Sequence, residues 1–209
     1  MKIRALLFDA DEVLQYSDPN RNADLVRILG FMPEPIAEFV AEVHAAEDTT
    51  LTGLLDFLDV LPRVLSRWGV SDKAGEVREW LNAINVDHGI LELVSQLRLR
   101  GYQCALATNQ QSHRAKFMAD QLRYRTLFER CFFSCEMGLA KPDPRYFQAI
   151  LKELQAEADD VVFIDDKPSN VRAATSLGIH GICFANSRDG RAQSDLRNLF
   201  AQFGISADT

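Results

Sequence analysis

Long hydrophobic runs are missing from this sequence of 209 residues. No stretch stays apolar over the roughly 20 residues that a helix needs to cross a bilayer. Residues 1–4 lead directly into a predicted strand and not into the longer apolar region of a signal peptide. These absences disfavour a membrane or secreted protein, and we expect a cytoplasmic one.

Cysteine and histidine are scarce, and neither occurs at the spacing of a metal site. The four cysteines include no Cys-x-x-Cys pair, and the four histidines are scattered along the chain. We therefore predict reduced thiols, buried in or beside core strands, and disfavour a zinc site. The cysteines concerned are Cys104, Cys131, Cys135 and Cys183.

Positive charge is also in short supply. The chain has 23 Lys and Arg residues against 30 Asp and Glu residues, which gives a formal net charge of −7. Extended binding to nucleic acid or to an anionic membrane needs a basic surface, so we expect neither as a partner. A hydrophobic fraction of 47% and a charged fraction of 25% are typical of a globular protein that can carry a sizeable insertion.

What the sequence does have is an apolar segment that ends in two carboxylates. A strand over residues 3–8 would be buried on both faces, as in a parallel sheet, and would deliver Asp9 and Asp11 to its carboxyl end. Open α/β sheets bind ligands at that edge. Two carboxylates there repel each other and repel phosphate unless a hard cation lies between them. The pattern indicates phosphate chemistry with magnesium, although a solvated acidic turn is the simpler interpretation of this segment alone.

Two later segments add groups that can bind phosphate. Residues 103–107 are a second apolar stretch, which stops at Thr108 and Asn109, and their hydroxyl and amide can hold a phosphate oxygen. Residues 138–144 form a predicted loop that presents one cation, Lys141. Taken singly, Thr108 could be a turn residue and Lys141 a surface lysine. Their common position after predicted strands favours a shared site.

A third apolar segment supplies two further acids. Residues 161–164 close on Asp165 and Asp166, and Pro168 marks the start of the next helix. Acids at this point could also cap the helix, and capping is compatible with metal binding. The segments predict strands whose carboxyl ends meet at one edge of a sheet.

The chain is predicted to contain two domains. Roughly ninety residues separate Asp11 from Thr108, whereas a crossover between parallel strands needs only about a dozen. Apolar residues recur at helical spacing in this interval, first over residues 36–43 and again from Leu54 to Trp68. We predict an α/β core domain of residues 1–15 and 87–209 and a helical cap domain of residues 16–86. After the cap, alternating strands and helices favour a mostly parallel sheet.

These motifs together resemble the haloacid dehalogenase superfamily, in its branch of small phosphatases and phosphomutases. The matching residues are Asp9-x-Asp11, Thr108, Lys141 and Asp165-Asp166-x-x-x-Asn170. The resemblance spans nearly the whole chain and implies a Rossmann-like parallel sheet with helices on both faces. It also implies that the helical insertion after the first motif closes over the active site and selects the substrate.

The resemblance assigns a role to each matching residue. Asp9 would be the nucleophile that forms an aspartyl-phosphate, and Asp11 the general acid and base. Thr108, Asn109 and Lys141 would bind the phosphoryl group. Magnesium would be held by Asp9, the backbone carbonyl of Asp11 and Asp166, with Asp165 acting directly or through a water. Asn170 would support this metal-binding loop.

The implied function is magnesium-dependent removal of phosphate from a small phosphorylated metabolite, such as a sugar phosphate. A phosphomutase shares every motif and is the nearest alternative. The second aspartate, Asp11, disfavours a dehalogenase, and the long insertion disfavours a signalling receiver domain. Glu12 stands where many relatives have glycine, so the turn either keeps a negative φ or is strained. This departure leaves a non-catalytic regulatory relative as a further alternative.

Overall fold

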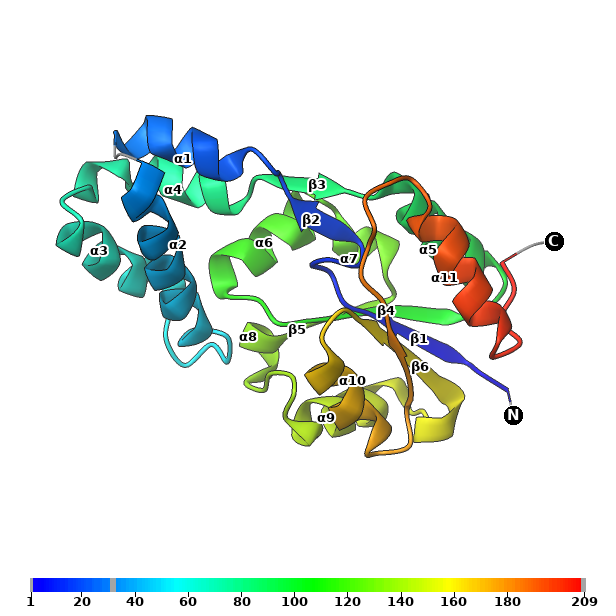
Figure 1. Ribbon diagram of the computed structural model, residues 1–209. Helices are drawn as coiled ribbons and strands as arrows, with labels where there is room; N and C mark the ends of the chain where they lie inside the picture. Colours follow the sequence, from blue (N-terminus) through cyan, green and yellow to red (C-terminus); the bar gives the residue numbers. More distant parts are fainter. Residues whose placement is uncertain (1, 31–32, 208–209) are drawn as a thin grey trace.

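The computed structural model describes residues 2–30 and 33–207, and its centre is a parallel sheet of five strands in the order β5-β4-β1-β6-β7 (Figure 1). The strands are β1 (Ala5–Phe8), β4 (Gln103–Thr108), β5 (Arg130–Phe133), β6 (Val161–Asp165) and β7 (His180–Cys183). Ala5 of the central strand pairs with Gln103 on one side and with Val161 on the other. The parallel α/β fold predicted from the sequence is confirmed.

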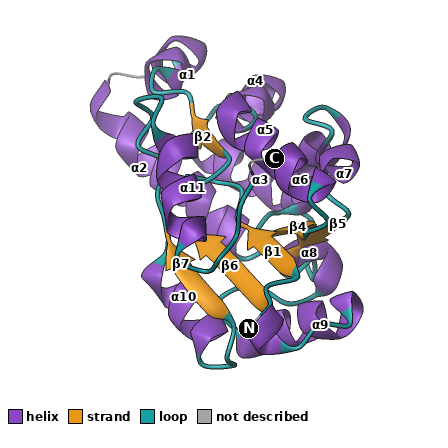
Figure 2. Cartoon of the chain, turned by 90° about the vertical axis from the view of Figure 1, so that its right-hand side faces the viewer, coloured by secondary structure: helices purple, strands orange, loops and turns teal. Residues whose placement is uncertain are grey.

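Helices cover both faces of this sheet (Figure 2). Side chains alternate along β1, so Leu6 and Phe8 enter one hydrophobic cluster while Ala5 and Leu7 enter another. The first cluster includes apolar residues of α5 (His88–Leu99), α6 (Ser112–Asp120), α7 (Tyr124–Leu127) and α11 (Ala192–Ala201). The second includes those of α9 (Pro144–Leu154) and α10 (Pro168–Thr175). A short helix, α8 (Ser134–Met137), follows β5, and a 3-10 turn, η2 (Ala158–Asp160), precedes β6.

A separate group of helices lies beyond one end of the sheet (Figure 1). It consists of α1 (Arg21–Leu29), α2 (Pro33–Asp48), α3 (Phe57–Arg67), the 3-10 turn η1 (Ser71–Lys73) and α4 (Ala74–Leu81). Their buried apolar residues form a third cluster, which includes Leu25, Phe39, Phe57 and Trp80. We call this group the cap helices. Two short antiparallel strands, β2 (Gln15–Ser17) and β3 (Ile84–Val86), lead into and out of it.

The structure differs from the sequence-based expectations in two places. The helix predicted from Leu54 begins only at Phe57, because the Asp56 side chain caps it by accepting a hydrogen bond from the Leu58 amide. Leu54 and Leu55 therefore lie in the preceding loop and are exposed. Among the thiols predicted to be buried, only Cys104 is fully buried, and Cys183 is exposed. In the part of the chain that the structure describes, no helix is both long enough and apolar enough to cross a membrane.

Candidate active site

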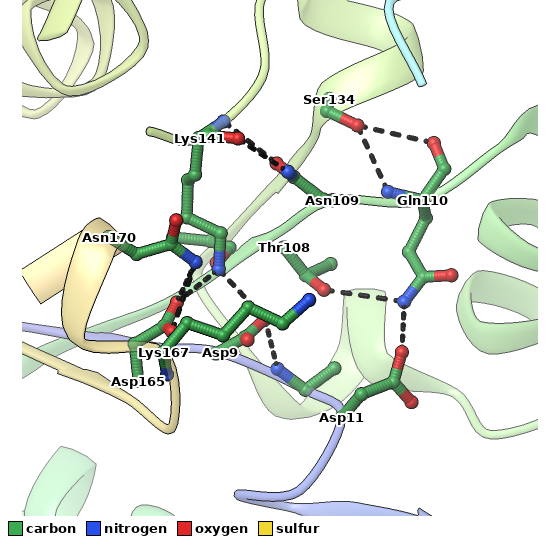
Figure 3. Close-up of polar contacts among 12 residues, drawn as sticks. Asp9, Asp11, Thr108, Asn109, Gln110, Ser134, Lys141, Asp165, Lys167 and Asn170 are labelled. Carbon is green, nitrogen blue, oxygen red and sulfur yellow. Dashed lines mark hydrogen bonds and ion pairs between the residues drawn. The ribbon is translucent and has the colours of Figure 1, made fainter. Parts of the chain in front are cut away.

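Strands β1, β4 and β6 end side by side and bring the predicted site residues together (Figure 3). Asp9 follows β1 and its amide donates to the Ile164 carbonyl of β6. Thr108 and Asp165 are the last residues of β4 and β6. All three side chains are buried. The carboxyl edge of the sheet is thus the place where the predicted acids meet.

Lys141 is the centre of this arrangement. Its Nζ lies 2.9 Å from Asp9 Oδ1 and 2.6 Å from Asp165 Oδ2. The same nitrogen donates to the Ala107 carbonyl at 2.9 Å, and the side chain is only 1% exposed. Burial by itself would lower the pKa of Lys141, but the two aspartates raise it above its usual value. Lys141 therefore remains a cation inside the protein.

Asp9 lies in a strongly desolvated environment. Burial raises the pKa of Asp9 from 3.8 to about 7, and repulsion from Asp165 adds to this rise, while Lys141 opposes it. The Ala10 amide also donates to Asp9 Oδ1 at 2.8 Å. Lys141 alone does not outweigh burial, and a further positive charge close to Asp9 would favour its ionised form.

Three carboxylates are placed where they fit a divalent cation. Oxygens of Asp9, Asp165 and Asp166 lie within 4.8 Å of one another. Oxygen ligands of this type suit magnesium, which usually binds through one or two carboxylates and keeps several waters. Burial and the nearby Asp165 raise the pKa of Asp166 above its usual value. Lys167 and Lys141 do not offset this rise, and a bound cation would add positive charge beside the acids.

Asp165 is the most restrained of these acids. Its two oxygens accept hydrogen bonds from Asn170 Nδ2, at 3.0 Å each. Oδ1 also accepts from the Lys167 amide at 2.8 Å, as in an Asx turn, and Oδ2 contacts Lys141. Asp165 thus orients Lys141 and the turn before α10 at the same time, and Asn170 holds it in place.

Asp11 points to a different set of partners. Gln15 and Arg114 donate to its Oδ1 at 2.9 and 2.7 Å, and Gln110 donates to Oδ2 at 2.7 Å. Burial would raise the pKa of Asp11, but the Arg114 charge and the two amide contacts lower it below its usual value. The Asp11 carboxylate is not among the three that lie within reach of one cation. It is held as an ionised group beside that cluster.

The two residues predicted after β4 have distinct surroundings. Thr108 Oγ1 accepts a weak contact from Gln110 Nε2 at 3.4 Å. Asn109 exchanges two hydrogen bonds with the backbone of Lys141, one from its Nδ2 at 2.8 Å and one to its Oδ1 at 2.9 Å. Both ends of the Asn109 amide are therefore engaged, and they fix the loop that carries Lys141. Thr108, which is buried, takes no part in fixing that loop through its hydroxyl.

Glu12 has the strained conformation that the sequence left open. Its φ is +61°, in the left-handed region where glycine is favoured. The Glu12 carbonyl accepts from the Asn186 amide at 2.6 Å, and its carboxylate forms an ion pair with Arg188. The carboxylate is therefore engaged by Arg188 and is not part of the acid cluster. The turn tolerates glutamate because contacts with residues 186–188 hold it.

Sequence reasoning missed the residues that surround Asp11. They are Gln15, Gln110 and Arg114, which come from three different segments. Lys167 lines a surface cavity together with Asp11, Gln110 and Arg114. Gln110 directly follows Thr108 and Asn109 and could have been included on that ground. Arg114, in the first turn of α6, had no signal in the sequence because any exposed helix can carry an arginine.

Comparison with known proteins agrees with this geometry. A family model described as haloacid dehalogenase-like hydrolase matches residues 3–178. Flavin mononucleotide hydrolase 1 from Arabidopsis thaliana is 32% identical over 99 residues, which cover 47% of this chain and 40% of that protein. Phosphorylated carbohydrates phosphatase from Thermotoga maritima is 24% identical over 182 residues, 86% of this chain and 84% of that protein. The chain spans only 10% to 40% of the length of four curated relatives, one of which is the Arabidopsis hydrolase.

The fold also matches solved structures. A HAD family enzyme from Bacteroides thetaiotaomicron, solved in complex with magnesium and inorganic phosphate, has a TM-score of 0.74 and 25% sequence identity. The match covers 90% of this chain and 96% of that enzyme. The sheet order, the acidic edge and the family match over residues 3–178 agree with one another. The chain belongs to the haloacid dehalogenase-like hydrolase family.

Proposed function

We propose that this protein is a magnesium-dependent phosphatase that removes phosphate from a small phosphorylated metabolite through Asp9. The contact of Lys141 with both Asp9 and Asp165, beside Asp166, is the observation that carries the proposal. It places one buried cation and three acids at the ligand-binding edge of the sheet. The magnesium and phosphate bound by the Bacteroides enzyme and the phosphatase activity named for the Thermotoga protein support it.

The reaction divides into two transfers. The Asp9 carboxylate attacks phosphorus, a bond forms between phosphorus and the Asp9 oxygen, and the ester bond to the leaving alcohol breaks. Water then hydrolyses the acyl phosphate, releases inorganic phosphate and restores Asp9. Lys141, already fixed by Asp165 and Asn109, stabilises negative charge on the transferring oxygens, and the Thr108 hydroxyl binds one of them.

The residues that would hold magnesium are Asp9, Asp166 and the backbone carbonyl of Asp11, with Asp165 directly or through a water. The ion would neutralise charge on the phosphoryl oxygens and on Asp9. Asp11 is the proposed acid and base. As an ionised group it is in the form that takes a proton from water. To protonate the leaving alcohol, Asp11 must first take up a proton from solvent, and this requires its contacts with Arg114 and Gln110 to loosen when substrate binds.

The predicted domain organisation is part of this proposal. Residues 16–86 form the cap domain and residues 1–15 and 87–209 the core, so that a cavity of about 580 Å³ is lined from both sides. The expected partner is a small phosphorylated compound, with no role for nucleic acid or a membrane. We also propose that the protein is cytoplasmic.

Phosphate release tests the reaction class. The parent protein, Asp9→Asn and a control variant, Asp72→Asn, are compared on an aryl phosphate with and without Mg²⁺. Asp72 has a 75% exposed side chain, so its replacement removes a carboxylate without touching the site. We expect Mg²⁺-dependent release by the parent and the control, and no release by Asp9→Asn although it folds. Full activity in Asp9→Asn would refute covalent catalysis by Asp9.

A further inference from the structure

Two arginines line the cavity at a distance from the nucleophile. Arg21 stands at the start of α1 in the cap helices, and Arg114 belongs to α6 of the sheet-based part. Asp11 and Lys141 line the same cavity. A ligand held in this cavity therefore shares it with both arginines.

Arg21 has no carboxylate partner among the ion pairs of the described residues. Its guanidinium lies over the Trp80 ring, 4.8 Å from the ring centroid, and its Nη2 lies 3.5 Å from His44 Nε2. Its Nη1 is buried and has no hydrogen-bond partner. The aromatic ring orients the side chain without using its donors, so part of the guanidinium fork remains free.

The nearby acid, Glu47, forms no ion pair with Arg21 among the described residues and is engaged by two other side chains. His44 Nδ1 lies 2.7 Å from Glu47 Oε2, and Gln111 donates to Glu47 Oε1 at 3.3 Å. Glu47 is thereby held between a cap histidine and the N-cap residue of helix α6. Arg21 thus lines the cavity with a nearby carboxylate that forms no direct ion pair with it.

Arg114 has a similar unused donor. Its Nη2 donates to Asp11, its side chain is 9% exposed, and its buried Nε has no partner. Burial and then the charge of Arg114 lower the pKa of Arg21, while the carboxylates of Glu47, Asp11 and Glu12 oppose this shift without cancelling it. Buried donors without acceptors and neighbouring like charges are both unfavourable. An anion within reach of both arginines would relieve both effects, since guanidinium groups match carboxylate and phosphate oxygens.

We propose that Arg21 and Arg114 bind a second anionic group of the substrate, remote from the phosphate that is transferred. The proposal rests on the phosphatase function and narrows its substrate class to small phosphomonoesters that also carry a carboxylate or a second phosphate. Arg21 is the specificity residue, since Arg114 also contacts Asp11. In this proposal the cap helices cover the site and also supply Arg21, which recognises the second negative charge of the substrate.

Equilibrium binding separates this proposal from catalysis. In the Asp9→Asn background, calorimetry compares 3-phosphoglycerate with glycerol 3-phosphate, which differ by a carboxylate against a hydroxymethyl group. A second pair, fructose 1,6-bisphosphate and fructose 6-phosphate, tests phosphate as the distal anion. We expect the member with the additional anion to bind roughly 10- to 100-fold more tightly in at least one pair.

Replacing Arg21 identifies the source of that preference. Arg21→Gln is expected to reduce the binding preference to within about threefold. The substitution removes the charge, and with it the contact to which we attribute the preference. Arg21→Lys keeps the charge and is expected to retain part of the binding preference. Comparing the two variants separates the effect of the charge from that of the side-chain shape. Arg27→Gln is the matched control, since Arg27 lies on the same helix with a 77% exposed side chain. It should leave the preference unchanged, and thermal melts verify that each variant is folded.

The outcomes for binding and for turnover are independent. Equal binding within both pairs, or a preference that survives Arg21→Gln, would overturn the anionic subsite even if the parent hydrolyses every probe. A preference that Arg21→Gln removes would establish the subsite. If the parent then released no phosphate from any probe, the proposed phosphatase function would fail while the subsite stood.

Discussion

Three buried or half-buried carboxyl groups lie close together beside the ammonium group of Lys141, which contacts two of them. Burial raises the pKa of Asp9 from 3.8 to about 7, and repulsion from Asp165 adds to the rise while Lys141 opposes it. The folded protein therefore binds more protons than the unfolded chain between these two pH values. Stability from this group is present at low pH and is lost as the pH rises through 7.

Asp9→Asn should stabilise the metal-free protein, and more so at high pH. The neutral amide keeps the shape of the side chain but removes one of the repelling charges. In EDTA, we expect the melting temperature of Asp9→Asn to exceed that of the parent by a few degrees at pH 8.5 and by less at pH 5.5. A gain of the same size at both pH values would mean that Asp9 does not carry the titration. Added Mg²⁺ should stabilise the parent more than the variant.

Glu12 tests the cost of a side chain in a left-handed turn. Its φ of +61° suits glycine, and its carboxylate pairs with Arg188. Comparing Glu12→Gly with Glu12→Ala isolates the backbone effect, because both variants lose the ion pair. We expect Glu12→Gly to be more stable than Glu12→Ala by about 1 kcal/mol in urea unfolding. If Glu12→Ala were equally stable, the turn would not be strained.

At the scale of elements, Gly53 lies in the loop after α2 and packs closely against the start of α8. Its φ is +69°, and a Cβ at this position would lie 2.1 Å from the Cys135 carbonyl oxygen. Gly30, which ends α1, has the same φ, but a Cβ added there would meet nothing within 4 Å. The two glycines therefore share a φ that disfavours a side chain, but they differ in what lies next to them.

Gly53→Ala should destabilise the protein more than Gly30→Ala. Both variants carry the cost of a left-handed alanine, about 1 kcal/mol, but only Gly53→Ala must also move backbone away from Cys135. We expect the free energy of unfolding of Gly53→Ala to be lower by at least about a further 1 kcal/mol. Urea unfolding of the two variants beside the parent measures the difference. Equal losses in the two variants would show that the contact between the loop and α8 yields freely.

The elements that the sequence predicted correctly are those with a strong local pattern. Strands β1, β4 and β6 are apolar runs buried on both faces, and a polar residue ends or directly follows each, so the meeting of Asp9 with Asp165 could be foreseen. Strands β2 and β3 could not, because three residues are too few to show a periodicity and their pairing joins residues 15 and 86. The contacts of Asp11 with Arg114 likewise depend on how α6 packs beside β1.

At the scale of the whole molecule, the hydrophobic core divides into parts that do not share residues. Two clusters lie on the faces of the sheet, and the third contains only residues of the cap helices and the turns between them. Contacts between the cap helices and the rest include polar pairs such as Glu47 with Gln111, Asp56 with Ser112, and Asn82 with His113. Separating the two parts would therefore expose little of either core.

The predicted domain division can be tested by removing the cap helices. Ser17 of β2 pairs with Ile84 of β3 in antiparallel register, so a two-residue Asn-Gly turn can replace residues 18–83 and close a hairpin. We expect the shortened chain to fold with its sheet intact, because both sheet clusters are complete without the cap, and to be stabilised by Mg²⁺ through Asp9 and Asp166. Circular dichroism and thermal melts with and without Mg²⁺ measure this. A chain that stays unfolded in Mg²⁺ would show that the cap helices are part of the folding unit of the sheet, and the division at residues 15 and 87 would be wrong.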